Sequence, residues 1–408
     1  MIRPRMHLTF VARSAGAGAA VCGQTKGAKK SMKIAVVKEI RDGERRVALV
    51  PESCRKLVKA GIEVAVESGA GEAAYFPDHA FVEAGAATGG DAAGLLGSAD
   101  LVLKVQPPAW NPSLGKHEAD LMREGAMLLG TLLPSRYPDV IEKLAARRIS
   151  AFATDRIPRI SRAQSMDTLS SMANIAGYKA VLIAANALPR YFPMLMTAAG
   201  TVLPAKVFVI GAGVAGLQAI ATAKRLGAAV EATDTRPAVK EQVESLGARF
   251  VGVAADASAQ DAAGYARELS AEFYRQQAAL IAERCAAADA VVTTALIGGV
   301  KAPRLITAEM VRAMKPGSVI VDVAAEGGGN CELTRPGATV TEGGVTIFGP
   351  LNLASEVPWH ASTLYSRNLA AFVLAFWKDG RFLIDRDDEI SRGALVTHGG
   401  AVLPPAGA

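Results

Sequence analysis

The sequence predicts an α/β protein with two doubly wound domains, the first of them discontinuous. From Met32 onward, short runs of β-branched residues alternate with helical segments, a pattern typical of parallel sheets covered by helices. The 408 residues include 40 glycines, and 50% are hydrophobic while only 5% are aromatic, which fits a chain with many tight strand–helix joints. The length exceeds that of one ordinary domain, so we expect two.

The first domain is expected over residues 32–158. Its predicted strands are 33–37, 62–67, 101–105, 126–129 and 149–153. A helix is predicted at 51–60, because Pro51 suits a first helical turn and Gly61 suits the end. A returning segment, residues 355–408, is expected to complete this domain with a short strand at 394–397.

Residues 1–31 are expected to lie outside the fold, either as a transit peptide or as sequence upstream of the true start at Met32. They contain six basic residues and no acidic one. Removing these six from the 45 basic residues leaves 39, against 39 acidic residues in the body of the chain. A neutral body argues against a nucleic-acid partner.

Neither a membrane span nor a metal site is expected. No run of about 18 uncharged apolar residues occurs, so we expect a soluble chain. The four cysteines and five histidines are scattered without metal-ligand spacing, and a reducing cytoplasm fits the cysteine pattern.

The second domain is expected over residues 159–354, with a cleft between the domains. A helix is predicted at about 174–188, and strands at 206–210, 229–233, 290–294 and 318–323. Residues 254–264 are small, polar and aperiodic, which predicts a long loop.

A G-x-G-x-x-G motif stands between the strand at 206–210 and a helix that runs to about Leu226. Gly211 permits a tight turn, Gly213 lets the backbone approach a pyrophosphate, and Gly216 lets helix and strand pack closely. The start of the helix favours the anion. The motif in this position predicts a Rossmann-like dinucleotide site.

The residues after the next strand bear on the choice of nucleotide. Asp234 follows that strand, where a carboxylate accepts hydrogen bonds from the adenosine ribose. Arg236 stands two residues on and suits a 2′-phosphate instead. Asp234 is the better placed of the two, so we expect NAD(H).

Residues 159–171 are dense in hydrogen-bonding groups and precede the dinucleotide motif. By pattern alone they can be a nucleotide-contacting segment. They can equally be a polar hinge in which Ser165 or Asp167 caps the following helix.

Six stretches resemble the NAD(H)-binding subunit of proton-translocating NAD(P) transhydrogenases, in the alanine dehydrogenase/transhydrogenase family. They are residues 158–167, 196–201, 211–228, 240–247, 315–320 and 327–331. The resemblance runs from Met32 almost to the end of the chain and leaves residues 1–31 outside. It implies an oxidoreductase with a nucleotide-binding Rossmann fold.

The resemblance also implies residue roles. Gln164, Arg159 and Asp167 would act at the reacting nicotinamide, with Gln164 nearest the ring. The remaining implied nucleotide contacts are Ile160, Ser161, Ser170, Val214, Asp234, Thr235, Arg236, Gly264, Tyr265 and Leu296. Tyr265 matches the tyrosine of a mobile loop that closes over nucleotide in the family.

Hydride transfer between two nicotinamides needs closeness, alignment and exclusion of water, but no nucleophile, metal or general base. The resemblance implies that NADP(H) binds a separate subunit and that a membrane subunit couples the reaction to proton translocation. It further implies a homodimer, peripheral to the inner membrane on the cytoplasmic side and active only with its partner subunits.

Two other functions compete with this one. Arg46 and Lys104 stand where alanine dehydrogenases hold their substrate, but residues 128–133 lack the catalytic histidine of those enzymes. We therefore interpret Arg46 and Lys104 as inherited surface or domain-interface charges. A regulatory nucleotide sensor is the non-enzymatic alternative, and no helix-turn-helix pattern or basic stripe supports it.

Overall fold

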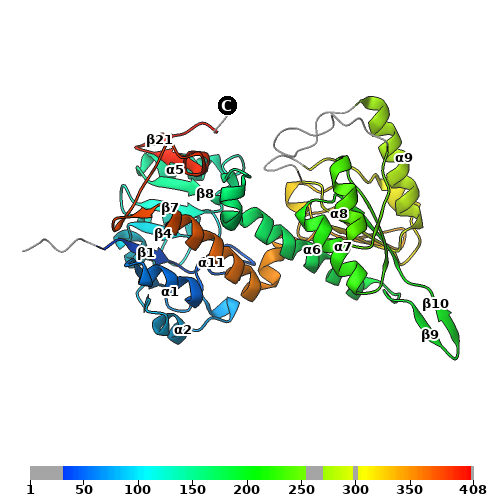
Figure 1. Ribbon diagram of the computed structural model, residues 1–408, viewed down its shortest axis with the longest axis horizontal. Coiled ribbons are helices and arrows are strands. Elements are labelled where there is room, and N and C mark those ends of the chain that lie inside the picture. Colours follow the sequence, from blue (N-terminus) through cyan, green and yellow to red (C-terminus); the bar gives the residue numbers. More distant parts are fainter. Residues whose placement is uncertain (1–30, 254–269, 297–301, 406–408) are drawn as a thin grey trace, which may run out of the picture. The chain divides into compact units, whose positions relative to one another are not determined.

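The computed structural model describes residues 31–253, 270–296 and 302–405, which contain two mainly parallel sheets with helices on both faces (Figure 1). Every predicted strand is present, with its ends within two residues of the prediction. The α/β prediction is confirmed. Among the described residues, no helix is long and apolar enough to cross a membrane.

The first sheet has eight strands in the order β21-β20-β8-β7-β4-β1-β2-β3. The strands are β1 (Lys33–Val36), β2 (Glu63–Val66), β3 (Ala87–Thr88), β4 (Leu101–Leu103), β7 (Met127–Gly130), β8 (Ser150–Ala153), β20 (Leu395–His398) and β21 (Ala401–Val402). The first six are parallel, and β20 joins β8 in the antiparallel sense. The C-terminal segment thus returns to the sheet that the N-terminal segment begins.

Helices cover both faces of this sheet. They are α1 (Pro51–Lys59), α2 (Asp78–Glu83), α3 (Ala92–Ser98), α4 (Glu118–Leu121), α5 (Pro138–Ala146), α11 (Pro358–Ala375) and α12 (Glu389–Ala394). One core joins α1 and α11 to the sheet, through residues such as Leu57 and Phe372. The other joins α3 and α5 to the opposite face, through residues such as Leu96 and Leu144.

The second sheet has seven strands in the order β13-β12-β11-β14-β15-β17-β16. They are β11 (Lys206–Ile210), β12 (Ala229–Thr233), β13 (Arg249–Phe250), β14 (Ala290–Thr293), β15 (Val319–Asp322), β16 (Thr339–Glu342) and β17 (Val345–Phe348). Only β16 pairs in the antiparallel sense. The parallel strands follow the doubly wound order 3-2-1-4-5-6, whose switch point lies between β11 and β14.

The helices of the second sheet are α6 (Thr168–Ala187), α7 (Val214–Arg225), α8 (Lys240–Ser245), α9 (Ala271–Ala287) and α10 (Ala308–Arg312). One core packs α6 and α7 on the sheet, and the other packs α9 and α10 on the opposite face. The helix expected at about 174–188 begins six residues earlier, because Asp167 caps it by accepting a hydrogen bond from the Ser170 backbone N–H at 2.8 Å.

Three two-stranded hairpins complete the described structure: β5 (Trp110–Asn111) with β6 (Lys116–His117), β9 (Leu195–Thr197) with β10 (Gly200–Val202), and β18 (Trp377–Lys378) with β19 (Arg381–Phe382). The β9–β10 hairpin extends away from the second sheet (Figure 1). All six of its strand residues are exposed.

Candidate functional site

The glycine turn joins β11 to α7 at the switch point of the second sheet. Gly211 has a φ of +94°, a left-handed conformation that L side chains rarely adopt. A Cβ on Gly216 would lie 1.8 Å from the carbonyl oxygen of Gly211. Beside Gly213, by contrast, the nearest atom to an added Cβ would be Nη2 of Arg236, at 3.9 Å. The turn is therefore closed at its two ends and open at Gly213.

This geometry fits a dinucleotide pyrophosphate. The helix α7 begins at Val214, directly after the open glycine, so its first backbone N–H groups lie beside that opening. Such groups, with the helix dipole, favour an anion. Val214 itself is exposed in this first turn.

Asp234 and Arg236 follow β12, next to the glycine turn. Asp234 accepts a hydrogen bond from the Ala212 backbone N–H at 2.7 Å, which ties it to that turn. Burial acts to raise the pKa of Asp234, but the Arg236 guanidinium and the backbone N–H groups outweigh burial and hold this pKa below its ordinary value. Asp234 is therefore ionised at neutral pH. Thr235 lies half-buried between the two charged residues.

The segment after β14 forms the third side of this region. The Thr294 hydroxyl donates a hydrogen bond to the Gly211 carbonyl at 3.0 Å. Leu296 is exposed, and its Cδ1 lies 2.7 Å from where a Cβ on Gly327 would stand. Leu296 thus lies against the loop that follows β15.

Asn330 links the loops after β14 and β15, and the sequence prediction missed it. Its Oδ1 accepts hydrogen bonds from the Thr293 hydroxyl at 2.6 Å and from the Ala295 N–H at 3.0 Å. Its Nδ2 donates to the carbonyls of Ala295 and Pro303. An asparagine after a glycine run has no distinctive spacing, so only the fold reveals this role.

The polar segment predicted before the dinucleotide motif forms a 3₁₀ helix, η3 (Ser161–Met166). The side chains of Arg159, Ser161 and Gln164 are exposed, whereas Ile160 packs against the core of the first sheet. Of the two candidate capping residues, Asp167 is the cap of α6, and it also accepts a hydrogen bond from the Ser170 hydroxyl at 2.6 Å.

The helix α6 connects this segment to the glycine turn. A Cβ on Gly177 of α6 would lie 2.0 Å from the carbonyl oxygen of Ala215 in α7, so the two helices touch at the backbone. Nearby, Asn174 Nδ2 donates a hydrogen bond to Gln218 Oε1 at 3.1 Å. The structure therefore brings Gly211–Gly216, Asp234–Arg236 and Leu296 together, and holds α6 on the same helix. Gly264 and Tyr265 lie outside the described residues.

The interpretation of Lys104 as a surface or interface charge is wrong. Lys104 is 1% exposed, and its ammonium group lies 2.8 Å from Glu118 Oε1 and 3.3 Å from Glu39 Oε2. Burial acts to lower the pKa of Lys104, but the two carboxylates outweigh it and raise this pKa. For Glu39, burial dominates and raises the pKa of the carboxyl. The trio lies at the carboxyl ends of β1 and β4, the switch point of the first sheet.

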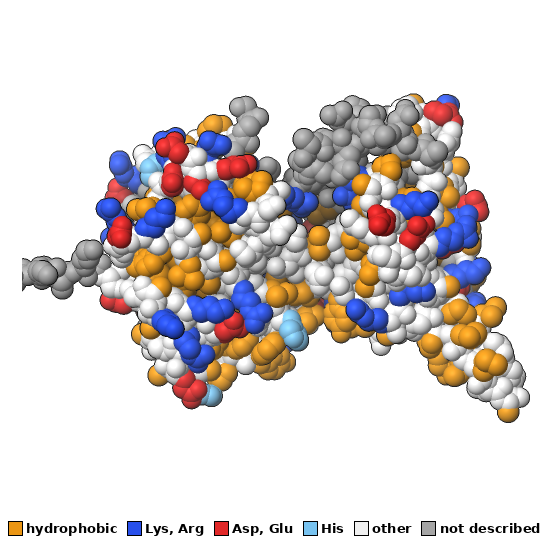
Figure 2. Space-filling view, viewed as in Figure 1, with side chains coloured by type: hydrophobic (Ala, Val, Ile, Leu, Met, Phe, Trp, Pro, Cys, Tyr) orange, Lys and Arg blue, Asp and Glu red, His pale blue; other side chains and the backbone are white. Residues whose placement is uncertain are grey.

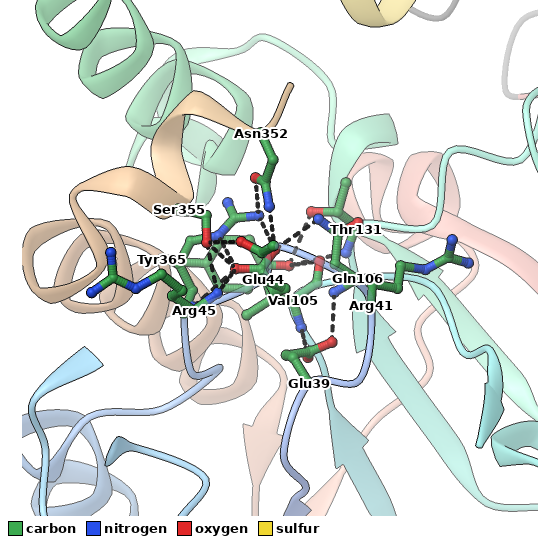
Figure 3. Close-up of polar contacts among 12 residues, drawn as sticks. Glu39, Arg41, Glu44, Arg45, Val105, Gln106, Thr131, Asn352, Ser355 and Tyr365 are labelled. Carbon is green, nitrogen blue, oxygen red and sulfur yellow. Dashed lines mark hydrogen bonds and ion pairs between the residues drawn. The ribbon is translucent and has the colours of Figure 1, made fainter. Parts of the chain in front are cut away.

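Arg46 is also buried, so the surface part of that interpretation is wrong for it as well. Its guanidinium binds both Glu44 oxygens, at 2.8 and 2.6 Å, and donates to Asn352 Oδ1 at 3.0 Å. Figure 3 shows Glu44 at the centre of this cluster, with Gln106, Asn352 and Ser355 around it. Because residue 352 follows β17, the cluster joins the two sheets.

Comparison with known proteins agrees with this geometry. Residues 35–176 match the family described as "Alanine dehydrogenase/PNT, N-terminal domain", and residues 180–405 match its C-terminal domain. The first of the separate chains that make up the NAD(P) transhydrogenase alpha subunit of Rhodospirillum rubrum is 51% identical over 379 residues, which cover 92% of this chain and 98% of that protein.

Solved structures show the same relationship. A transhydrogenase from Sinorhizobium meliloti has a TM-score of 0.82 and 46% identity, covering 91% of this chain and all of that one. An L-alanine dehydrogenase has a TM-score of 0.76 and 29% identity, covering 92% and 98%. The alanine dehydrogenase alternative is therefore not favoured. The chain belongs to the alanine dehydrogenase/PNT family and, within it, to the NAD(P) transhydrogenase alpha subunits.

Proposed function

We propose that this chain binds NAD(H) and presents its nicotinamide for direct hydride transfer to NADP+ held on a separate subunit. The observation that carries the proposal is the glycine turn, which is open only at Gly213 and lies at the switch point of a doubly wound sheet. The 51% identity to a transhydrogenase alpha subunit supports the same reaction.

The proposed nucleotide site runs along the carboxyl edge of the second sheet. Gly211, Gly213, Val214 and Gly216 would hold the pyrophosphate at the start of α7. Asp234, Thr235 and Arg236 would face the adenosine ribose, because they follow the neighbouring strand β12. Leu296 would line the site beyond β14, and Gly264 and Tyr265 are proposed to complete it.

The nicotinamide end is assigned to the segment before α6. Gln164 and Arg159 would orient the ring, with Ile160, Ser161, Asp167 and Ser170 around them. Support comes from exposure: Arg159, Ser161 and Gln164 point away from the core, as a surface that meets a second nucleotide requires. Asp167 and Ser170 hold each other and fix the end of α6 behind that surface.

The chemistry asks little of the protein beyond geometry. The dihydronicotinamide supplies the hydride, and the residues around it need only to position the ring and exclude water. No proton has to be taken up by a side chain. Gln164 and Arg159 are therefore proposed as orienting groups, with Re/Si stereospecificity set by the faces that they leave open.

The family implies partners for the complete reaction. We infer an NADP(H)-binding subunit and a membrane subunit that couples hydride transfer to proton translocation. The chain would then be active only with these partners and would be held at the cytoplasmic surface of the inner membrane through them. The word "subunit" in the names of its relatives supports this arrangement.

A homodimer is proposed on the β9–β10 hairpin. Met196 is 73% exposed and Leu203, just after β10, is 75% exposed, with Tyr191 and Met194 exposed beside them. Figure 2 shows hydrophobic side chains gathered on this hairpin. An isolated two-stranded hairpin is marginally stable in water, and such an apolar surface is usually covered. A second copy of the chain is the proposed cover.

The role of Gln164 is tested by Gln164→Asn, which shortens the side chain and keeps the amide. With the partner subunits present, hydride transfer should fall by about 10²-fold, because a misplacement of about 1 Å costs that much. NADH affinity of the isolated chain should stay within about twofold, since most of the binding energy comes from the remaining contacts. The matched control is Gln276→Asn, at an exposed glutamine of α9. Equal losses in both variants, or a lost affinity without slower transfer, would contradict the assignment.

A further inference from the structure

The Asp234 carboxylate already receives four hydrogen bonds within the chain. Two come from backbone N–H groups: Ala212 donates to Oδ2 at 2.7 Å and Arg236 donates to Oδ1 at 2.9 Å. Two come from the Arg236 side chain: Nε donates to Oδ1 and Nη2 donates to Oδ2, both at 2.9 Å. The guanidinium thus grips both oxygens in the two-pronged geometry that arginine favours with carboxylates.

A carboxylate has about four acceptor sites, two on each oxygen. The four bonds to Asp234 fill them. The 2′- and 3′-hydroxyls of an adenosine ribose each need one of these sites if Asp234 is to bind them. The two backbone bonds are fixed by the chain, so the two side-chain bonds are the ones that a ribose can replace.

We propose that Arg236 is an internal competitor for the ribose site, released from Asp234 when NAD(H) binds. The inference rests on the proposed NAD(H) site and adds a selectivity device to it. In the free chain, Arg236 neutralises the half-buried carboxylate. In the complex, the two ribose hydroxyls occupy the places of Nε and Nη2 on Oδ1 and Oδ2.

The same pair excludes NADP(H). A 2′-phosphate would remove the donor that Asp234 needs and place a dianion beside its charge. The cation that suits this phosphate, Arg236, is held by Asp234 with its Nη2 close to Gly213. Removing the charge of Asp234 should therefore turn Arg236 into a phosphate ligand without any further change.

The test is an equilibrium titration of NADH and of NADPH into the isolated full chain, followed by dihydronicotinamide fluorescence. Arg236→Met removes the competitor while keeping the side-chain length. NADH should then bind about 3- to 10-fold more tightly, the equivalent of one hydrogen bond that no longer has to be broken, while NADPH binding stays weak. Arg225→Met, an exposed arginine at the other end of α7, is the matched control and should change neither affinity.

Asp234→Asn tests the second half of the inference. NADH should bind about tenfold less tightly and NADPH about tenfold more tightly. The double variant Asp234→Asn with Arg236→Met should lose the NADPH gain. Thermal unfolding of each variant shows whether it is folded, and Arg236→Lys, which keeps the charge but not the two-pronged grip, should give an intermediate NADH affinity.

The outcomes separate this inference from the proposed function. Wild-type chain that binds NADH, with an Arg236→Met variant that binds it equally or less tightly, overturns the competitor role and leaves the NAD(H) site standing. An Asp234→Asn variant without any NADPH gain overturns the selectivity role. Wild-type chain that binds no NADH overturns the proposed function together with the inference.

Discussion

The ammonium group of Lys104 lies 2.8 Å from Oε1 of Glu118, and both side chains are almost fully buried. The other oxygen of Glu118 accepts a hydrogen bond from the Ala109 N–H at 2.9 Å, and Glu39 accepts one from the Val105 N–H at 2.6 Å. The ion trio therefore fixes the loop after β4 as well as its own charges. In an open α/β sheet this switch point is where a ligand binds, and here three of the chain's own side chains fill it.

Lys104→Met should destabilise the fold by about 3–5 kcal/mol, because it leaves two buried carboxylates without their cation. Urea unfolding at pH 7 measures the loss. The control is Lys143→Met, whose ion pair with Asp120 is largely exposed, and it should cost less than about 1 kcal/mol. Equal costs for the two lysines would show that the trio is not a stabilising element.

Glu44 makes the stability depend on pH in the acid range. Burial acts to raise its pKa, but Arg46 and Gln106 outweigh burial and lower this pKa to about 2, against an ordinary value of 4.5. A carboxyl with a lowered folded-state pKa contributes stability above pH 4.5 and loses it as the pH falls toward 2. Between pH 7 and pH 3, wild-type chain should therefore lose about 2 kcal/mol more than Glu44→Gln. Urea unfolding of both at the two pH values checks this, and parallel losses would contradict it.

The two glycines Gly213 and Gly216 should respond differently to alanine. Gly216→Ala places a methyl group 1.8 Å from the Gly211 carbonyl oxygen, so it should lower the melting temperature and abolish NADH binding. Gly213→Ala meets no backbone atom within 4 Å, so the chain should stay as stable as wild type. NADH should still bind at least tenfold less tightly, at about 1.4 kcal/mol per factor of ten, because the methyl group keeps the pyrophosphate from the backbone. Normal NADH affinity in Gly213→Ala would place the pyrophosphate elsewhere.

The hairpin should control the oligomeric state. Met196→Asp puts a charge on the exposed apolar surface of β9 and should convert a dimer to monomers in sedimentation equilibrium. Val82→Asp, at an exposed valine of α2 outside the hairpin, is the control and should leave the dimer intact. A wild-type chain that sediments as a monomer would refute the proposed homodimer directly.

The parallel strands could be predicted because each is a buried β-branched run, as at Lys206–Ile210 and Val319–Asp322. The short strands β13 and β16 at the sheet edges carry no such signal. The hairpin was missed because 195–202 reads as a motif of the family, and its exposed alternation resembles a loop. For α6, the signal was present in Asp167, but the polar residues 168–174 concealed the first helical turns.

The buried charges could not be predicted for a different reason. A lysine after a strand is usually exposed, and the burial of Lys104 depends on Glu118, which is 14 residues away and arrives through the short helix α4. Arg46 depends in the same way on Asn352, which is 306 residues away and has a left-handed φ of 50°. Such pairs become visible only when the fold brings their elements together.

The most direct test of the proposed function is a cyclic hydride-exchange assay. The purified chain is mixed with the soluble NADP(H)-binding component of a related transhydrogenase, with NADH, an oxidised NAD analogue, and NADP(H) as carrier. The proposal predicts that the analogue is reduced only when both proteins and NADP(H) are present. Absence of exchange, with NADH consumed by this chain alone on addition of pyruvate and ammonia, would contradict it and indicate an amino-acid dehydrogenase.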